Sequence, residues 1–359
     1  MTHIHIGLIG TGGIAGAHCH AFKGVEDATI SAVYDINQDA ARSFRSQFDI
    51  PQVYQSVEDM LTDPGIDAVI IAVPNVFHAP LAIQALKAGK HVLLEKPMAM
   101  SVREAMEIAH TVADSGLTLM IAHQLRFHPV INRIRHQIQK GALGNIYHAK
   151  AGWVRRKGIP GYGGWFTQKK LAGGGPLIDL GVHMLDIGMD LMGQPRPVSV
   201  SGKVYGKLGS RGIGVGGYGG ATHSGTYDVE DFATALIRFE DDRTLQLDVS
   251  WAAHILSDEE PYLELLGDLG GARFKGGNGT LLTELFDQPA SVSLQVEDRD
   301  ENERTAQSRH FISCIQTKKD PVSHVQTGIM NQAIIDAIYR SSESGQEETI
   351  ELPILAPST

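Results

Sequence analysis

The feature that most limits the possible folds stands at the start of the chain, where the apolar run Ile4–Ile9 leads into a turn of small residues. This turn, Gly10-Thr11-Gly12-Gly13-Ile14-Ala15, precedes a helical pattern. Gly10 permits a tight turn, Gly12 lets the backbone approach a pyrophosphate, and Ala15 allows close helix packing. The N-terminus of the helix offers free N–H groups to the phosphates. The order of strand, turn and helix therefore predicts a dinucleotide-binding α/β unit.

Asp35 indicates which dinucleotide is bound. It ends the next predicted strand, residues 29–34, and lies 20 residues after Ala15. A carboxylate at this distance is expected to bind the ribose 2′-hydroxyl and to repel a 2′-phosphate. No Arg or Lys follows directly, so the sequence favours NAD over NADP. The alternative is that Asp35 caps the predicted helix 38–48.

Polar residues follow two further predicted strands. The apolar run His91-Val92-Leu93-Leu94 is followed by Glu95-Lys96-Pro97. The predicted strand 68–73 is followed by Pro74-Asn75, and His78 stands where the next helix begins. Open α/β sheets hold their ligands at the carboxyl ends of strands, so Lys96 is a candidate ligand-binding group. Taken alone, the same tripeptide also fits a solvated lysine, and Asn and His are common in caps and turns.

The second half of the chain contains a narrow polar strip. An apolar stretch up to Met192 follows Gly173-Gly174-Gly175-Pro176. At about 100° per residue, four polar side chains fall on one side of the predicted helix. These are Asp179, His183, Asp186 and Asp190. The pattern predicts a buried helix whose strip faces a cavity.

Asp179 lies one helical turn before His183, where its carboxylate can orient the imidazole and raise its basicity. One alternative is a metal site made of Asp179, His183 and Asp186, although no further His or Cys stands nearby at typical ligand spacing. A second alternative is a structural strip bonded to neighbouring backbone groups.

Glycines are concentrated between Gly202 and Gly225, with 10 in 24 residues. This segment predicts a long flexible loop, either a lid or an insertion without function. Alternating strands follow from residue 231, with helices near 305–316 and 327–342 and a last strand at 349–352. We therefore predict an α/β domain over residues 1–123 and an α+β domain with a largely antiparallel sheet over 124–359. The last helix and strand are the part of the second domain expected to pack near the first.

Length and composition exclude several classes of protein. The chain has 359 residues, which is too long for one hydrophobic core, and its formal net charge of -10 argues against nucleic acid as a partner. No apolar run approaches the ~18 residues that span a bilayer. The N-terminus lacks a signal-peptide pattern, so a cytoplasmic location is expected. Cys19 and Cys314 lack the spacing of a zinc or redox site.

With these motifs in order, the chain resembles the Gfo/Idh/MocA family of sugar and cyclitol oxidoreductases. Val229-Glu230-Asp231-Phe232-Ala233 and the segment Gly267-Asp268 to Gly270-Gly271 also resemble that family. The resemblance implies a Rossmann domain followed by a domain with an open-faced sheet. It also implies a homodimer or homotetramer formed through that sheet.

The resemblance also implies residue roles. Lys96 would bind the reacting hydroxyl, His183 would accept its proton, and Asp179 would support both. The cofactor would contact the Gly10–Ala15 turn and further residues, which are Asp35, Pro74, Asn75, His78, Glu95 and Lys96. The candidate substrate contacts, besides Lys96, Asp179 and His183, are Arg126, which matches the Arg-Phe pair of the family, and Arg155, Tyr162 and Trp165, which are candidates by location only. No metal is expected.

The implied reaction is reversible hydride transfer between a secondary alcohol of a sugar, glycoside or inositol and the nicotinamide of NAD. Two alternatives use the same fold. One is a non-catalytic sensor of NAD or sugar, which the presence of both Lys96 and His183 disfavours. The other is an NAD-dependent glycosidase, which would release free sugar without net NADH.

Overall fold

The computed structural model describes residues 3–216, 225–297 and 300–353, and the chain divides into two compact units. The first unit contains the residues up to Gln124 together with Glu301–Gln332. The second contains Leu125–Asp300 and Ala333–Leu352. Helix α9 (Glu303–Thr317) and the start of α10 (Val325–Ser344) therefore belong with the first unit, whereas the sequence analysis gave all residues after 123 to the second domain.

The first unit is built on a parallel sheet. Its six described strands have the order β3-β2-β1-β4-β5-β6, which reverses between β1 and β4 as in doubly wound nucleotide-binding sheets. The strands are β1 Ile4–Ile9, β2 Ala28–Tyr34, β3 Gln52–Val53, β4 Ala68–Ile71, β5 His91–Leu94 and β6 Leu119–Ile121. The flanking helices are α1 Gly13–Phe22, α2 Gln38–Phe48, α3 Val57–Thr62, α4 His78–Lys87 and α5 Val102–Ser115. The predicted α/β domain is confirmed.

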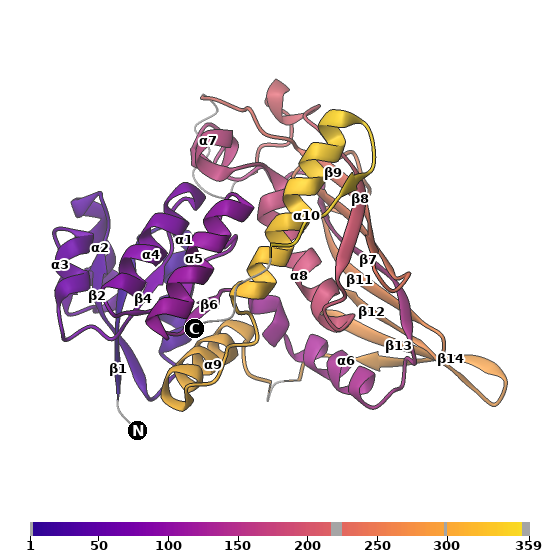
Figure 1. Ribbon diagram of the computed structural model, residues 1–359, viewed down its shortest axis with the longest axis horizontal. Coiled ribbons are helices and arrows are strands. Elements are labelled where there is room, and N and C mark those ends of the chain that lie inside the picture. The colour runs from indigo at the N-terminus through magenta and orange to yellow at the C-terminus, as the bar shows by residue number, and fades with distance from the viewer. Residues whose placement is uncertain (1–2, 217–224, 298–299, 354–359) are drawn as a thin grey trace. The chain divides into compact units, whose positions relative to one another are not determined.

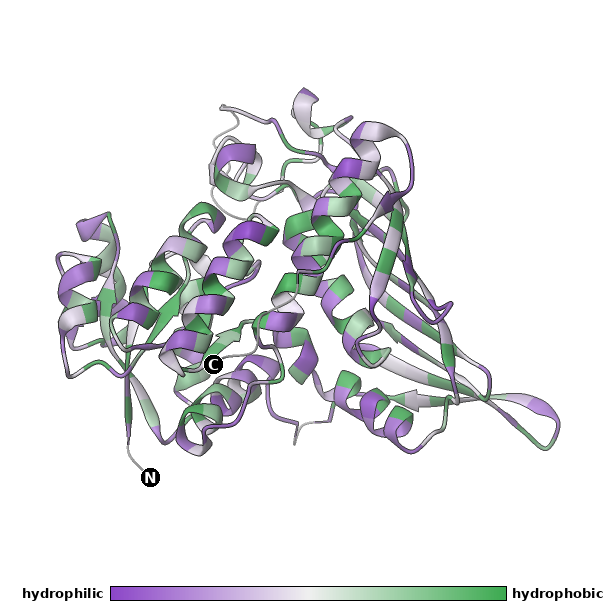
Figure 2. Ribbon diagram, in the orientation of Figure 1, coloured by the Kyte–Doolittle hydropathy of each residue, from purple (hydrophilic) through white to green (hydrophobic). Residues whose placement is uncertain are grey.

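Local sequence explains these elements. Every residue of β4 is buried, as expected of a parallel strand covered on both faces. Figure 2 shows the contrast between such green strands and the helices around them, where green and purple residues alternate. Helix α5 begins where the Ser101 hydroxyl accepts a hydrogen bond from the Glu104 N–H, and it ends at Gly116, whose φ is +64°.

The second unit is built on a mainly antiparallel sheet, as predicted. Its described strands have the order β14-β13-β12-β11-β7-β10-β9-β8-β15, and only the β7 and β10 pair is parallel among them. The first strands are β7 Ile146–Arg155, β8 Pro197–Tyr205, β9 Phe232–Phe239, β10 Thr244–Ser250 and β11 Glu259–Gly267. The remaining strands are β12 Gly271–Lys275, β13 Asn278–Leu285, β14 Gln288–Leu294 and β15 Glu348–Thr349. The helices are α6 Pro129–Gln139, α7 Lys169–Ala172 and α8 Val182–Leu191, with the later part of α10.

Helices cover one face of this second sheet. In Figure 1 α6 and α8 lie on the same side of the strands, and α8 packs on β7, β10 and β11. Strand β10 shows the resulting alternation, because Leu245 and Leu247 are buried beneath the helices. Gln246 and Asp248, on the opposite face, are hydrogen-bonded to each other. The described residues supply no helix over that face.

Two expectations about this unit need correction. The sequence analysis missed β7, the strand that joins the two halves of the sheet, because its apolar residues do not alternate regularly. The predicted glycine-rich loop begins later than Gly202, since residues 202–205 belong to β8 and pair with β9. A 3-10 turn then follows at Gly209–Arg211. Residues 217–224 of the predicted loop lie outside the described residues.

No described helix combines the length and the apolar character that crossing a bilayer requires.

Candidate functional site

The turn after β1 has the geometry of a dinucleotide-binding loop. Gly10 has a φ of +99°, and a Cβ at this position would lie 2.2 Å from the carbonyl oxygen of Ala72. Gly12 is exposed, and a Cβ there would meet no atom within 4 Å. No side chain caps the N-terminus of α1, so its first N–H groups are available to a ligand. The turn therefore fits the pyrophosphate of a dinucleotide.

Asp35 is fixed at the end of β2 by the same turn. Its Oδ2 accepts hydrogen bonds from the N–H of Thr11 at 2.9 Å and from the Thr11 hydroxyl at 2.8 Å. Its Oδ1 accepts a hydrogen bond from the N–H of Asn37 at 2.8 Å. Helix α2 is capped by Asn37, not by Asp35, so the capping alternative for Asp35 is wrong. The Asp35 carboxylate thus lies beside the glycine-rich turn, at the end of β2.

Lys96 directly follows a buried carboxylate at the end of β5. Glu95 is buried, and its Oε1 lies 2.8 Å from Nε2 of His18 on α1. Burial alone raises the pKa of Glu95, but the hydrogen bond and charge of His18 outweigh it and lower this pKa to about 2. Lys96 itself is half-buried, which disfavours the interpretation of a fully solvated lysine.

His78 lies on the other side of the same segment. One ring nitrogen is 2.7 Å from the carbonyl oxygen of Pro97, and the other is 2.9 Å from that of Val73. The resemblance assigns His78 to the cofactor, whereas both of its ring nitrogens face carbonyl oxygens of the protein backbone. Burial lowers the pKa of His78, and the two carbonyls, which only accept hydrogen bonds, oppose that effect. The neighbouring Asn75 is also buried, and it begins a 3-10 turn.

In the second unit the triple-glycine segment brings the chain close to two other elements. A Cβ at Gly174 would lie 1.9 Å from the Tyr339 hydroxyl oxygen, and a Cβ at Gly175 would lie 2.1 Å from the carbonyl oxygen of Glu230. Oε1 of Glu230 accepts hydrogen bonds from the N–H groups of Gly175 and Leu177, at 2.9 and 3.1 Å. The Tyr339 hydroxyl donates to the same oxygen at 3.0 Å. Glu230 and Tyr339 thus fix the start of the following helix.

The helix does not begin as the sequence predicted. Leu177–Gly181 is one turn of π-helix, and α8 continues from Val182. A π-turn has more residues than an α-turn, so the angles of the predicted strip do not hold through Asp179. π-turns inside helices are frequent at functional sites. The four polar residues therefore do not form the single predicted strip that faces a cavity. They form two groups, each with different partners.

The first polar group contains Asp179 and His183. Oδ2 of Asp179 accepts a hydrogen bond from the indole N–H of Trp251 at 2.9 Å. The His183 ring lies with its centroid 6.0 Å from that of Trp153, and its exposed fraction is 6%. Two tryptophans therefore stand beside the predicted acid and base. Trp251 is fully buried, so of the two rings the half-buried Trp153 is the one available to the apolar face of a ligand.

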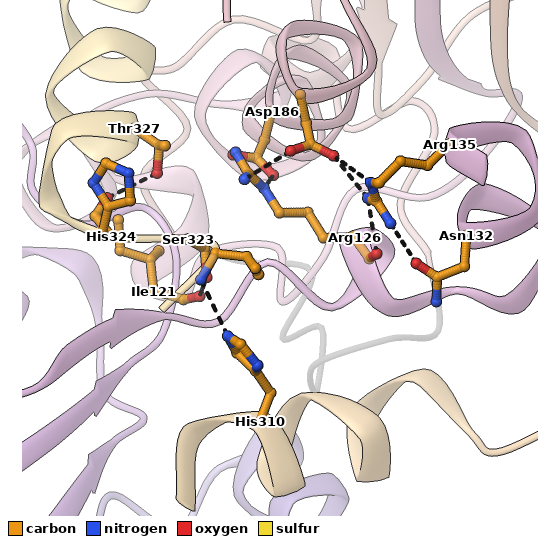
Figure 3. A network of polar contacts seen from close by, with 11 residues as sticks. Ile121, Arg126, Asn132, Arg135, Asp186, His310, Ser323, His324 and Thr327 are labelled. Atoms are coloured by element: carbon orange, nitrogen blue, oxygen red, sulfur yellow. Dashed lines mark hydrogen bonds and ion pairs between the residues drawn. The ribbon is translucent and has the colours of Figure 1, made fainter. Parts of the chain in front are cut away.

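The second polar group contains Asp186 and Asp190. Asp186 is completely buried and binds the Arg126 guanidinium with both oxygens, at 2.7 and 2.8 Å. Asp190 contacts Arg126 at 3.0 Å and Arg135 at 2.7 Å. Figure 3 shows the Arg126 and Asp186 pair, with Arg135 reaching Asn132 beyond it. Burial alone lowers the pKa of Arg126, but the two carboxylates raise it.

This pairing changes the interpretation of three predicted residues. Asp186 and Asp190 neutralise arginines instead of facing a cavity, and Arg126, expected at the substrate, has an exposed fraction of 3%. Because both oxygens of Asp186 bind Arg126, this carboxylate is not available to the alternative metal site. The described part of the chain contains no group of three or more His, Cys, Asp or Glu arranged to hold a metal ion.

The remaining substrate candidates differ in their surroundings. The Arg155 guanidinium lies 5.3 Å from the Trp153 ring centroid and donates to Glu259 at 2.7 Å. Tyr162 is buried and donates its hydroxyl to the carbonyl of Gly209. Trp165 stacks on Phe166 with ring centroids 3.8 Å apart. Arg155 thus contacts Trp153, whose ring lies beside that of His183.

Sequence reasoning missed several residues that fix these groups. Trp251 ends an alternating strand, and nothing in that pattern indicates that its indole reaches Asp179, 72 positions earlier. Glu230 was noted only as part of a motif. His18 stands at an ordinary helix position, and its contact with Glu95 spans 77 positions.

Comparisons with known proteins agree with this architecture. A family model described as an oxidoreductase family with an NAD-binding Rossmann fold matches residues 4–123. A second model, described as the C-terminal alpha/beta domain of an oxidoreductase family, matches residues 135–352. Together the two models span nearly the whole chain.

Individual relatives give the same result. The chain is 32% identical to D-glucoside 3-dehydrogenase of Escherichia coli (strain K12), over 95% of this chain and 96% of that protein. It is 26% identical to levoglucosan dehydrogenase of Pseudarthrobacter phenanthrenivorans, over 84% of this chain and 76% of that one. A solved structure of levoglucosan dehydrogenase in complex with NADH has a TM-score of 0.88 at 21% identity, covering 98% of this chain and 100% of that chain. At this identity the structural match establishes the shared fold.

Proposed function

The chain belongs to the Gfo/Idh/MocA oxidoreductase family, and we propose that it oxidises, reversibly, a secondary alcohol on a sugar, glycoside or cyclitol ring with NAD⁺. The observation that carries the proposal is the π-turn that leads into α8. Asp179 stands on that turn, beside the indole of Trp251, and His183 stands at the start of α8, beside the ring of Trp153. The similarity to D-glucoside 3-dehydrogenase makes a D-glucoside, oxidised at its 3-hydroxyl, the first substrate to test.

The residues of the first unit fit a bound NAD. The open backbone at Gly12 and the uncapped start of α1 suit the pyrophosphate, and the Asp35 carboxylate suits the ribose diol. The same carboxylate disfavours the 2′-phosphate of NADP by charge repulsion. Bound NAD⁺ supplies a hydride acceptor.

The protein residues would handle the proton and the developing charge. His183 would accept the proton of the reacting hydroxyl at a ring nitrogen, and the Asp179 carboxylate would help to orient the imidazole. The Lys96 ammonium would donate a hydrogen bond to the hydroxyl oxygen and stabilise it as it becomes an alkoxide. Trp153 would offer its ring to the C–H face of the sugar.

A screen for NADH formation tests the proposal. D-glucosides, free aldoses and cyclitols would be assayed with NAD⁺ and NADP⁺ in parallel, and the variant His183→Ala would serve as the inactive control. We expect NADH from at least one glycoside or sugar and a weaker signal with NADP⁺. NAD binding without turnover of any substrate would indicate a sensor. Release of free sugar without net NADH would indicate a glycosidase.

We also propose that copies of the chain associate through the uncovered face of the second sheet. On that face Tyr262 donates a hydrogen bond to Asp248, and the two form a half-buried polar patch with Gln246. Such a broad, flat surface offers more area than a single loop for two copies to bury. Light scattering coupled to gel filtration should give a dimeric or tetrameric mass, and Tyr262→Glu should lower it. A monomeric mass for the unmodified protein would overturn this part of the proposal.

A further inference from the structure

His18 and Glu95 form a buried pair inside the first unit. His18 stands on α1 with an exposed fraction of 1%, and Glu95 follows β5 with an exposed fraction of 6%. The distance from Nε2 of His18 to Oε1 of Glu95 is 2.8 Å, which is that of a strong, charge-assisted hydrogen bond. A buried carboxylate without such a partner would be very costly. His18 therefore allows Glu95 to be charged at this position.

Glu95 also contacts the residue that follows it. Its second oxygen, Oε2, accepts a hydrogen bond from the backbone N–H of Lys96 at 3.2 Å. The N–H of Glu95 donates to the carbonyl of Ile71 at 3.0 Å, which ties the segment to β4. The carboxylate of Glu95 thus connects α1 to the backbone of Lys96.

A second histidine holds the other side of Lys96. One ring nitrogen of His78, on α4, lies 2.7 Å from the carbonyl oxygen of Pro97, and the other lies 2.9 Å from that of Val73. The backbone of Lys96 is therefore held by His18 through Glu95 on one side, and by His78 through Pro97 on the other. His18 contacts the Glu95 carboxylate, which accepts the bond from the Lys96 N–H, and His78 faces the carbonyl of Pro97 directly. These contacts restrict where the Lys96 side chain begins.

We propose that His18 is a positioning residue for Lys96 and acts through the Glu95 carboxylate. The inference rests on the role given to Lys96 in the proposed function. Because His18 lies on the helix whose N-terminus fits the pyrophosphate, the same contact keeps Lys96 in a fixed relation to the cofactor turn. A displacement of about 1 Å in a group that holds the reacting atom is sufficient to lower the rate about 10²-fold.

The first test measures positioning without any substrate. Hydrogen exchange, read by mass spectrometry on peptides that contain Lys96, reports the protection of its N–H. We expect His18→Ala to increase the exchange rate of this amide about 10-fold or more. His18→Gln, whose amide nitrogen can replace Nε2, should retain most of the protection. Cys19→Ala, which changes the next buried residue of α1, is the matched control and should leave the amide protected.

The second test measures the catalytic consequence. With a substrate from the screen, His18→Ala should lower kcat about 10- to 100-fold while the Kd for NAD changes less than about threefold. His18→Gln should recover most of kcat. Glu95→Gln, which keeps the shape but removes the charge, should lower kcat in the same way, and the effects of His18→Ala and Glu95→Gln should not multiply when the two are combined.

The outcomes separate the two proposals. Faster exchange at Lys96 in His18→Ala, in a protein that oxidises no sugar, would overturn the proposed function and support the positioning role. Unchanged exchange in both His18→Ala and Glu95→Gln would overturn the positioning role even if sugar oxidation is found. Equal losses in His18→Ala, His18→Gln and Cys19→Ala would show that only the packing of α1 matters, and would also overturn it.

Discussion

The indole N–H of Trp251 donates a hydrogen bond to the Asp179 carboxylate at 2.9 Å. Trp251 is fully buried at the end of β10, while Asp179 lies on the π-turn before α8. The bond therefore fixes the position of a carboxylate that stands four residues before His183. It connects the end of β10 to the carboxylate that is expected to support the base.

Replacing Trp251 with Phe should remove this bond while keeping an aromatic ring against Phe166. A hydrogen bond to a charged group contributes about 1.5–3 kcal/mol, so kcat/KM should fall about 10- to 100-fold. Steady-state kinetics with the substrate from the screen would measure the loss. A thermal melt would show whether the fold is retained, and a value of kcat/KM within twofold of the unmodified enzyme would contradict the role of this bond.

Replacing His183 with Ala should lower kcat by about 10²–10⁴-fold, because one positioned acid or base typically contributes that much. The Kd for NAD, measured by calorimetry, should stay within about threefold, since the cofactor-binding turn belongs to the first unit. His148→Ala is the matched control. His148 also lies in the second unit, on β7, where it bonds to the Thr244 hydroxyl, and its loss should leave kcat unchanged.

Replacing Asp35 with Ser should shift the cofactor preference toward NADP. The change removes the carboxylate expected at the 2′-hydroxyl and the charge that repels a 2′-phosphate. We expect kcat/KM for NAD⁺ to fall about 10- to 100-fold and the value for NADP⁺ to rise. Asp39→Ser, an exposed carboxylate on α2, is the control and should keep the NAD⁺ value. Unchanged preference in Asp35→Ser would remove Asp35 from its predicted role.

The dinucleotide turn was predictable because its requirements are local. The tight turn itself requires the positive φ of Gly10. Strand β1, this turn and helix α1 follow one another directly in the chain. The parallel order of the first sheet follows from such repeating strand and helix units. The antiparallel pairing of β9 and β10 could also be predicted from the sequence, because apolar and polar residues alternate in both strands and a short turn connects them.

The grouping of the polar side chains of α8 was not predictable from the sequence. The pattern from Asp179 to Asp190 is compatible with a continuous α-helix, and the π-turn depends on Glu230 and Tyr339, which lie far along the chain. Likewise, Asp186 pairs with Arg126, 60 positions earlier. Local periodicity identifies which residues are polar on a buried helix, but the tertiary structure determines which partner each one meets.

Glu95 should make the stability of the protein depend on acid pH. Its pKa falls from 4.5 to about 2 on folding, so its contribution is complete above about pH 4.5 and is lost as the pH falls toward 2. At neutral pH this contribution is about 3 kcal/mol. In urea titrations Glu95→Gln should therefore be less stable than the unmodified protein at pH 7. The difference should shrink at pH 3, and a difference that grows on acidification would contradict an ionised Glu95 in the folded protein.

A residue without a side chain should be required at position 174, because the hydroxyl group of Tyr339 lies where a Cβ would be. A Cβ at this position would lie 1.9 Å from the Tyr339 hydroxyl, so Gly174→Ala should lower the free energy of unfolding by about 1–3 kcal/mol. Tyr339→Phe removes that oxygen and costs about 1 kcal/mol through the lost bond to Glu230. Combining the two changes should restore part of the stability lost in Gly174→Ala.

Gly175 provides the control for this rescue, because its Cβ would meet the backbone oxygen of Glu230, which Tyr339→Phe leaves in place. Tyr339→Phe should therefore rescue Gly175→Ala less than it rescues Gly174→Ala. Urea unfolding of the single and double variants measures both cycles. If Gly174→Ala is rescued no better than Gly175→Ala, the Tyr339 hydroxyl is not what excludes a side chain at Gly174, and the close approach of α10 to this segment would need another cause.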